Sequence, residues 1–234
     1  MFVDGYNLGE FRVDSDKTMV YDHVTRVPFL IKGPGIDAGQ VLTHVASMAD
    51  VAPTLLELVA GTSASGHVRA EMDGTSWAPL LLAKNGSMNG GTVTPATCLR
   101  TATLIELQSS GKMNRCSNMN IASAPGTPPA IVYNYSCHYH DGPNNTFAAM
   151  RVIAPETGDL LYAEFVDGSD PAGYYFAPSA INFYELYNVT EDYYQLRNVY
   201  SEASPALKSL LHDRLQHAVA CKGSKQCEAF LELP

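Results

Sequence analysis

The chain has 234 residues, with 24 acidic side chains, 15 basic side chains and a formal net charge of -9. With 46% apolar and 17% charged residues, it has the composition of a globular protein, which excludes a disordered chain. Its length allows one domain or two small ones. Because the chain is acidic and has no extended basic run, the sequence argues against nucleic acid or an anionic membrane as a partner.

The sequence carries conflicting signals about its compartment. No apolar stretch reaches the roughly 18 to 20 residues that span a bilayer, and the first residues lack the basic and apolar parts of a secretion signal. Four Asn-x-Ser/Thr glycosylation motifs nevertheless fall in expected turns or strand ends, at Asn85, Asn134, Asn144 and Asn188. They indicate the secretory pathway, extracellular or lysosomal in type, and the simplest resolution is that Met1 is not the natural start.

Cysteine spacing supports the same compartment. Cys221 and Cys227 enclose a short glycine-containing loop that a disulfide can close, and both are expected just past a helix end. The alternative is two unrelated buried thiols. The pairing of Cys98, Cys116 and Cys137 stays open, although Cys116 and Cys137 are placed to pin a long surface loop over residues 108–143.

The first third of the chain predicts an α/β layer. Residues 27–32 form an apolar run that ends at Gly33-Pro34-Gly35, which predicts a buried strand and a tight turn. Asp50 is predicted to cap a helix over residues 51–60, which Gly61 ends. The apolar side chains on one face of this helix are Leu55, Leu56 and Val59. Strand, turn and capped helix in this order are typical of an α/β core.

The remainder predicts a smaller α+β unit. Residues 84–95 are rich in turn formers and predict a linker between a first region, 1–83, and a second region, 96–234. Apolar runs predict strands at 99–107, 147–154, 160–166 and 183–189, and short connections favour an antiparallel sheet. A last helix begins at Ser204 and Pro205. Its apolar stripe packs on the sheet and consists of Leu207, Leu210, Leu211, Leu215 and Val219.

The densest group of charged side chains lies in the first 26 residues, where it is either a solvated connection or the rim of an active site. The motifs that decide are Gly5-Tyr-Asn-Leu-Gly-Glu10, Asp16-Lys17-x-x-x-Tyr21-Asp22-x-x-x-Arg26-Val-Pro28 and Gly33-Pro-Gly-Ile36. Two further motifs follow them, at residues 50–61 and 72–81. In this order they resemble a stretch of the sulfatase family, and the motif at residues 72–81 resembles the segment that closes its catalytic domain.

Motifs in the second region extend the resemblance. They are Leu104-Ile-Glu106, Asn145-Thr-Phe-x-x-x-Arg151, Leu161-Tyr-Ala-Glu-Phe165, Glu185-Leu-Tyr-Asn-Val189 and the Cys221 to Cys227 loop. They resemble the C-terminal subdomain of the glucosamine-6-sulfatase and extracellular endosulfatase branch. The resemblance implies an α/β fold: an alkaline-phosphatase-like sulfatase core remnant that carries a C-terminal α+β subdomain. The implied activity is hydrolysis of sulfate esters on sugars.

The resemblance also implies parts that this chain lacks. The family nucleophile is a formylglycine made from the first residue of Cys/Ser-x-Pro-x-Arg. No cysteine here has proline two residues on, and Ser123 and Ser169, which do, lack the arginine. The N-terminal Asp pair that supplies half of the family's calcium ligands has no counterpart either. Since calcium takes six to eight oxygens, this chain alone is not expected to complete the cage.

Several positions carry over from the family, one at a time. Lys17 matches the lysine that contacts the sulfate or leaving-group oxygen, a role suited to a compact positive charge. Asn7 stands where this branch usually has a substrate-contacting histidine. For the calcium ligand, strict alignment puts Val3 in place of a carboxylate, whereas a one-residue deletion leaves Asp4 as the ligand. Tyr21, Asp22 and Arg26 match positions with a mainly structural role.

The leading hypothesis is therefore a calcium-dependent sulfuric ester hydrolase, arylsulfatase or N-acetylglucosamine-6-sulfatase in type, present as an incomplete chain. Its substrate is a sulfated carbohydrate, and the chain alone is expected to be inactive. The alternative is a non-catalytic remnant that binds sulfated glycan through Lys17 and neighbouring cations. A third reading, a relative that acts on phosphate esters, is disfavoured by the Gly-Tyr and Lys17 spacings.

Overall fold

The computed structural model describes residues 5–12, 17–42, 44–60, 71–83, 87–88, 91–92, 100–108, 145–154, 158–166 and 176–231. Several predicted features lie outside these residues: Asp4, the motifs at Asn85, Asn134 and Asn144, and the cysteines Cys98, Cys116 and Cys137. Most of the predicted linker lies outside them as well. Its described residues form two short antiparallel strands, β1 (Ser87–Met88) and β2 (Gly91–Thr92).

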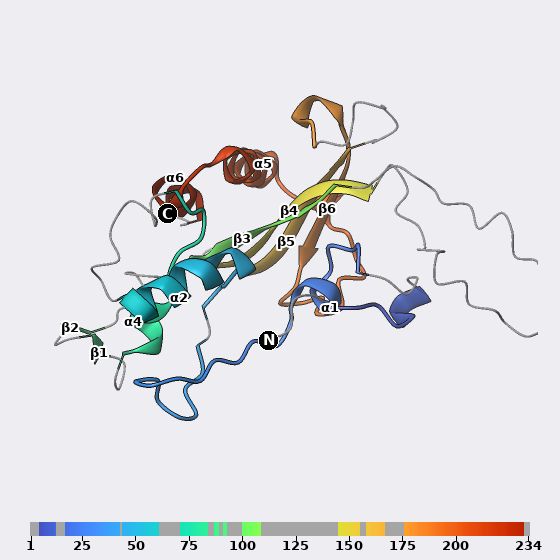
Figure 1. Cartoon of the computed structure of the whole chain (residues 1–234). Helices are drawn as coiled ribbons and strands as arrows, with labels where there is room; N and C mark the ends of the chain where they lie inside the picture. Colours follow the sequence, from blue (N-terminus) through green and yellow to red (C-terminus); the bar gives the residue numbers. More distant parts are fainter. Residues whose placement is uncertain are drawn as a thin grey trace, which may run out of the picture.

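A four-stranded antiparallel sheet forms the centre of the molecule (Figure 1). Its strands follow one another in chain order as β3 (Ala102–Leu107), β4 (Thr146–Ala154), β5 (Gly158–Val166) and β6 (Ile181–Asn188). The antiparallel sheet predicted from the sequence is confirmed. A register irregularity falls at Phe165 and Val166, where β5 pairs with β6.

Successive side chains of a strand point to opposite sides of the sheet. Both faces are covered, each by its own buried cluster. On one face, Met150 and Tyr162 pack with Leu211 and Leu215 of α5 (Pro205–Ala220). On the other face, a second buried cluster holds Val20 from the N-terminal region against Phe147, Leu161 and Tyr187. Figure 1 shows α5 on one side of the sheet and α1 (Asp22–Thr25) on the other. The N-terminal region is thus part of the sheet's packing.

Helix α5 begins as predicted. The Ser204 hydroxyl accepts a hydrogen bond from the backbone N–H of Leu207, and Pro205 occupies the first turn. The predicted apolar stripe needs one correction. Leu211, Leu215 and Ala218 are buried, but Leu210 is 38% exposed. Leu210 lies one residue before Leu211, about 100° around the helix, and so points past the sheet.

A further helix, α6 (Ser224–Leu231), follows α5 and was not predicted. A disulfide joins Cys221, at the end of α5, to Cys227 within α6. The loop between them also contacts the first region of the chain, because the backbone N–H of Gly223 donates to Asp73 Oδ1 over 2.7 Å. The disulfide loop therefore contacts the segment just before α4 as well as closing on itself.

The first region contains the predicted helix, α2 (Val51–Ala60), with the short helix α4 (Ala78–Leu81) beside it. The predicted cap is wrong in detail. Ser47 caps the 3-10 helix η2 (Met48–Asp50) that leads into α2, and Asp50 Oδ2 accepts from the Ser47 backbone N–H in return. The remaining 3-10 helices are η1 (Glu10–Arg12), η6 (Pro178–Ala180) and η7 (Tyr200–Glu202).

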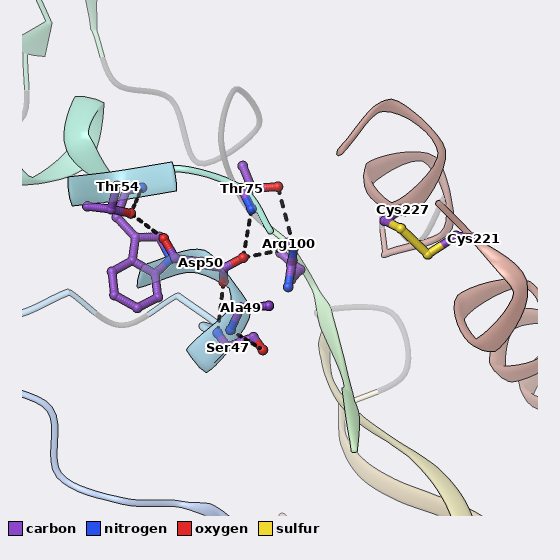
Figure 2. A network of polar contacts seen from close by, with 9 residues as sticks. Ser47, Ala49, Asp50, Thr54, Thr75, Arg100, Cys221 and Cys227 are labelled. Atoms are coloured by element: carbon purple, nitrogen blue, oxygen red, sulfur yellow. Dashed lines mark hydrogen bonds and ion pairs between the residues drawn. A yellow bond between two sulfur atoms is a disulfide. The ribbon is translucent and has the colours of Figure 1, made fainter. Parts of the chain in front are cut away.

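Asp50 instead organises a buried polar network (Figure 2). Its Oδ1 accepts from the Thr75 backbone N–H at 2.7 Å and pairs with Arg100 Nη2 at 3.0 Å. The Thr54 hydroxyl in turn donates to the Asp50 carbonyl at 2.6 Å. This network holds α2 against the segment before α4 and against the start of β3.

Residues 27–32, predicted as a buried strand, have no strand assignment. Among the described residues, no backbone hydrogen bond holds this segment. Its exposure still alternates residue by residue, with Phe29 packed edge-on against Trp77 and Leu30 81% exposed. The turn after it is present, because Gly35 has a φ of +82° and the Ile36 N–H donates to the Gly33 carbonyl. The segment thus has the side-chain pattern of a strand without a strand beside it.

No helix of the described residues is both long and apolar enough to cross a membrane.

Candidate functional site

The predicted site begins at Lys17, whose surroundings are fixed by the sheet. Val20, three residues on, is buried in the second core cluster. Asn145 Nδ2, at the edge of β4, donates to the Thr18 carbonyl over 2.8 Å. These two contacts hold the segment from Lys17 to Tyr21 on the sheet and leave the Lys17 side chain at the surface, where it is exposed.

Tyr21 and Asp22 tie the same segment to the sheet through side chains. The Tyr21 hydroxyl donates to Glu185 Oε1 at 3.3 Å, and Arg151 Nε pairs with Asp22 Oδ1 at 3.0 Å. Arg151 also donates to Asp159 and to two backbone carbonyls. Burial raises the pKa of both Tyr21 and Glu185. These contacts agree with the structural role expected of Tyr21 and Asp22, whereas the Arg26 side chain is exposed.

Asn7 lies in the segment that runs against α1. The Gly5 N–H donates to the Val24 carbonyl at 2.9 Å, and a Cβ at Gly5 would lie 2.5 Å from that oxygen. Only glycine permits this approach. Asn7, two residues on, is fully buried, and neither its Nδ2 nor its Oδ1 has a partner among the described residues. Buried amides are seldom left in this state.

The two described members of the predicted site differ in exposure, since Asn7 is buried and Lys17 is exposed. Asp4 lies outside the described residues. At Asn188, the fourth glycosylation motif ends β6, with its side chain half-buried.

The described residues do not fit the family's calcium ion. They contain no group of three or more His, Cys, Asp or Glu side chains that could hold a metal. A calcium ion needs six to eight oxygen ligands, so no step of the chemistry is derived through it.

A pocket of about 470 Å³ opens beside α1. Its walls come from η1, from α1 and the residues after it, and from the loop Tyr193 to Gln195 that follows β6. The sequence did not predict this pocket, since its walls are more than 160 residues apart in the chain. The signal available was weak: Tyr193 and Tyr194 stand four and five residues after the Glu185–Val189 motif.

A second polar cluster lies between α5 and the sheet and was also missed. Glu164 is fully buried and accepts from the Tyr162 hydroxyl and from Gln216 Nε2, both at 2.6 Å. His212 Nδ1 lies 2.7 Å from the same carboxylate. Burial and the bond to Glu164 raise the pKa of Tyr162. With three partners the carboxylate is satisfied, so the cluster attaches α5 to β5.

Comparisons with known proteins agree with this architecture. The N-acetylglucosamine-6-sulfatase of Bos taurus is 30% identical over 221 residues, which are 94% of this chain and 34% of that protein. The arylsulfatase of Chlamydomonas reinhardtii is 30% identical over 224 residues, which are 94% of this chain and 29% of that protein. The extracellular sulfatase SULF-1 homolog of Drosophila melanogaster is 42% identical over 81 residues, which are 35% of this chain and 7% of that protein. No family model matches the chain.

A solved structure from Bacteroides thetaiotaomicron, described under metabolism of multiple glycosaminoglycans and labelled 4S-sulf, has a similar fold. It matches 89% of this chain and 34% of its own, with a TM-score of 0.54 and 17% identity. The fold is thus the alkaline-phosphatase-like fold of the sulfatases. The chain belongs to the sulfatase family and spans about a third of the length of the relatives it matches.

Proposed function

We propose that this chain is the C-terminal part of a sulfuric ester hydrolase that acts on sulfated sugars, in the manner of N-acetylglucosamine-6-sulfatases or arylsulfatases. The observation that carries the proposal is the match to an N-acetylglucosamine-6-sulfatase along 94% of the chain. Within the matched chain, contacts of Arg151 and Glu185 fix the segment after Lys17. A segment held in this way presents a lysine at a reproducible position.

Lys17 is the group of this chain that we assign to the chemistry. In sulfate ester hydrolysis, negative charge grows on the leaving-group oxygen and is shared by the sulfate oxygens. A lysine ammonium beside that charge stabilises the transition state more than the ground state. The exposed position of Lys17 supports this role, because an incoming anion can reach it.

The nucleophile has to come from a part of the enzyme other than these 234 residues. No Cys/Ser-x-Pro-x-Arg motif occurs among them, and we therefore expect this chain alone to be inactive. The metal of the family, which we take to be calcium, likewise needs ligands from a part of the enzyme other than these residues. Its chemistry, when bound, is electrostatic: a cation that holds sulfate oxygens.

We place the protein in the secretory pathway. The disulfide between Cys221 and Cys227 supports an oxidising compartment, and the four glycosylation motifs point the same way. The Drosophila relative is named as an extracellular sulfatase.

A chimaeric enzyme tests the proposal. The matching third of the Bos taurus relative is replaced by this chain, and release of sulfate from N-acetylglucosamine 6-sulfate is measured. We expect turnover by the chimaera and none by the 234-residue chain. A folded, secreted chimaera without turnover contradicts the proposal, and so does turnover by the chain alone.

The exposed Lys17 also supports a second function, a non-catalytic module that binds sulfated glycan. It predicts that the chain alone is retained on heparin at low salt, and that Lys17→Ala and added salt both weaken retention. Passage through the column at low ionic strength contradicts this alternative.

A further inference from the structure

The residue that follows Lys17 is held by a side chain from the sheet. Asn145 Nδ2 donates to the Thr18 carbonyl over 2.8 Å, although the two residues are 127 positions apart. An amide NH2 group donates and a backbone carbonyl accepts, so this contact determines which end of the Asn145 amide faces Thr18. The bond is part-buried, and it restrains the chain one residue beyond Lys17.

The backbone of Asn145 is itself well anchored, because β4 begins at the next residue. Thr146 pairs with Val166 of β5, and Phe147 pairs with Phe165. Thr146 is 0% exposed and Phe147 is 2% exposed, so neither can shift without disturbing a close-packed core. An asparagine side chain has only two rotatable bonds, and its amide therefore moves little once its backbone is fixed.

The segment that carries Lys17 has its next anchor at Val20. Val20 is 2% exposed and packs in the same cluster as Phe147. Thr18 and Met19 stand between Lys17 and Val20, and both are only half-buried. Consecutive Cα atoms are about 3.8 Å apart, so three steps of chain would separate Lys17 from Val20 if the Asn145 bond were lost. With the bond in place, a fixed point lies one residue from Lys17.

We propose that Asn145 is a positioning residue for Lys17. By holding the Thr18 carbonyl, it sets where the lysine ammonium stands relative to a bound sulfate ester. The contacts of Tyr21 and Asp22 with the sheet act further along the chain. Placement matters because a displacement of about 1 Å can lower the rate of a reaction by about 10²-fold. Asn145 acts through Lys17 and needs no contact with the substrate, and the inference rests on the role proposed above for Lys17.

A double-mutant cycle on the Bos taurus chimaera separates positioning from folding. Asn145→Ala removes the donor but leaves Asn144 and Thr146, the two defining residues of the glycosylation motif. With Lys17 present, we expect this change to lower kcat by about tenfold at a nearly unchanged KM, because a displaced lysine stabilises the transition state less. In a Lys17→Ala chimaera, Asn145→Ala should cause no further loss. Asn145→Gln, which keeps the donor on a longer side chain, should recover part of the rate.

Asn198→Ala is the matched control. Asn198 Nδ2 likewise donates to a backbone carbonyl, that of Tyr184, at 2.9 Å. Tyr184 packs against the cluster under α5, whereas Val20 belongs to the cluster on the other face of the sheet. Asn198→Ala therefore removes the same kind of bond away from Lys17. We expect it to leave kcat unchanged even where it lowers the thermal midpoint.

Amide NMR relaxation of the 234-residue chain gives a readout that needs no activity. We expect order parameters of about 0.85 for the Lys17 and Thr18 amides, as in a rigid backbone, and a fall toward about 0.6 in Asn145→Ala. Asn198→Ala should leave both values unchanged.

Three results overturn the inference. The first is unchanged order parameters at Lys17 and Thr18 in Asn145→Ala. The second is an active chimaera whose kcat Asn145→Ala does not lower, and the third is an equal loss of kcat with and without Lys17, which indicates a purely structural role. An inactive parent chimaera contradicts the proposed hydrolase instead, and the order parameters then still decide whether Asn145 holds Lys17 in place.

Discussion

At the scale of single residues, the free-energy cost of burying a carboxylate depends on whether it has partners. Burial raises the pKa of Glu185 above its ordinary value of 4.5. Between the ordinary and the raised pKa, the folded chain holds a proton that the unfolded chain has released. The contribution of Glu185 therefore favours folding at low pH and is lost as the pH rises through the raised pKa.

Glu185→Gln removes this dependence while keeping an oxygen that accepts from Tyr21. We expect the unfolding free energy of the variant to fall less between about pH 4 and about pH 7 than that of the parent, as measured by urea unfolding. Glu191→Gln is the control, since Glu191 is exposed. Parallel pH profiles for Glu185→Gln and the parent chain would refute the burial argument.

Asp50 illustrates the opposite case, a buried carboxylate with its partners in place. Asp50→Ala removes the buried carboxylate that accepts from the Thr75 backbone N–H and pairs with the Arg100 guanidinium. We expect a loss of about 3 to 5 kcal/mol. Glu202→Ala, which breaks an exposed pair with Arg197, should cost about 1 kcal/mol or less. Equal losses in denaturant unfolding would show that the network of Figure 2 does not stabilise the fold.

At the scale of elements, α5 offers a comparison within one helix. Leu215 is fully buried against the sheet, whereas Leu210 is 38% exposed. Leu215→Ala should therefore lower the unfolding free energy by about 2 to 5 kcal/mol, and Leu210→Ala by about 1 kcal/mol or less. The same thermal or urea transition measures both. A larger loss for Leu210→Ala would mean that α5 packs with a different face.

The same helix shows what local sequence can predict. Ser204 and Pro205 mark its start because caps act within a few residues. The strands β4 and β5 can likewise be predicted from the sequence, since the apolar residues of each lie within one short segment. By contrast, Asp50 could be recognised as a helix-start residue, but its buried pairing with Arg100 depends on a contact 50 positions away. Contacts of that range are set by tertiary packing, which local patterns do not contain.

The candidate site was harder to predict from the sequence, because it too depends on contacts between residues far apart in the chain. Lys17 and Asn7 were found through motifs, and the structure adds that one is exposed and the other buried. Gln195 could not be found, because its partner is a backbone N–H of α1. The segment over residues 27–32 has the composition of a buried strand, yet within the described residues it lies beside no other strand.

At the scale of the whole molecule, the first region exposes apolar surface. Val59 on α2 is 87% exposed and Leu30 is 81% exposed. Leu55, predicted on the same face of α2 as Val59, is also exposed. Since the chain spans about a third of its relatives, we expect this surface to be covered in a complete sulfatase. Large exposed apolar patches otherwise cause association.

The 234-residue chain alone is therefore expected to self-associate, and Val59→Lys should reduce the association without lowering the thermal midpoint. Sedimentation velocity at several protein concentrations measures the change. Leu196→Lys serves as the control, since Leu196 is exposed on the loop after β6. A chain that stays monomeric at all concentrations would contradict the expectation.

Within a complete sulfatase, Lys17 is proposed to act directly on the sulfate ester. The most direct measurement is kcat/KM for N-acetylglucosamine 6-sulfate, taken on the Bos taurus chimaera carrying Lys17→Ala or Lys225→Ala. Lys225 is an exposed lysine of α6, and its replacement should leave the rate unchanged. Loss of a charge that stabilises the transition state should lower kcat, and kcat/KM with it, by about 10² to 10³-fold. A Lys17→Ala chimaera as active as the Lys225→Ala chimaera would contradict this role.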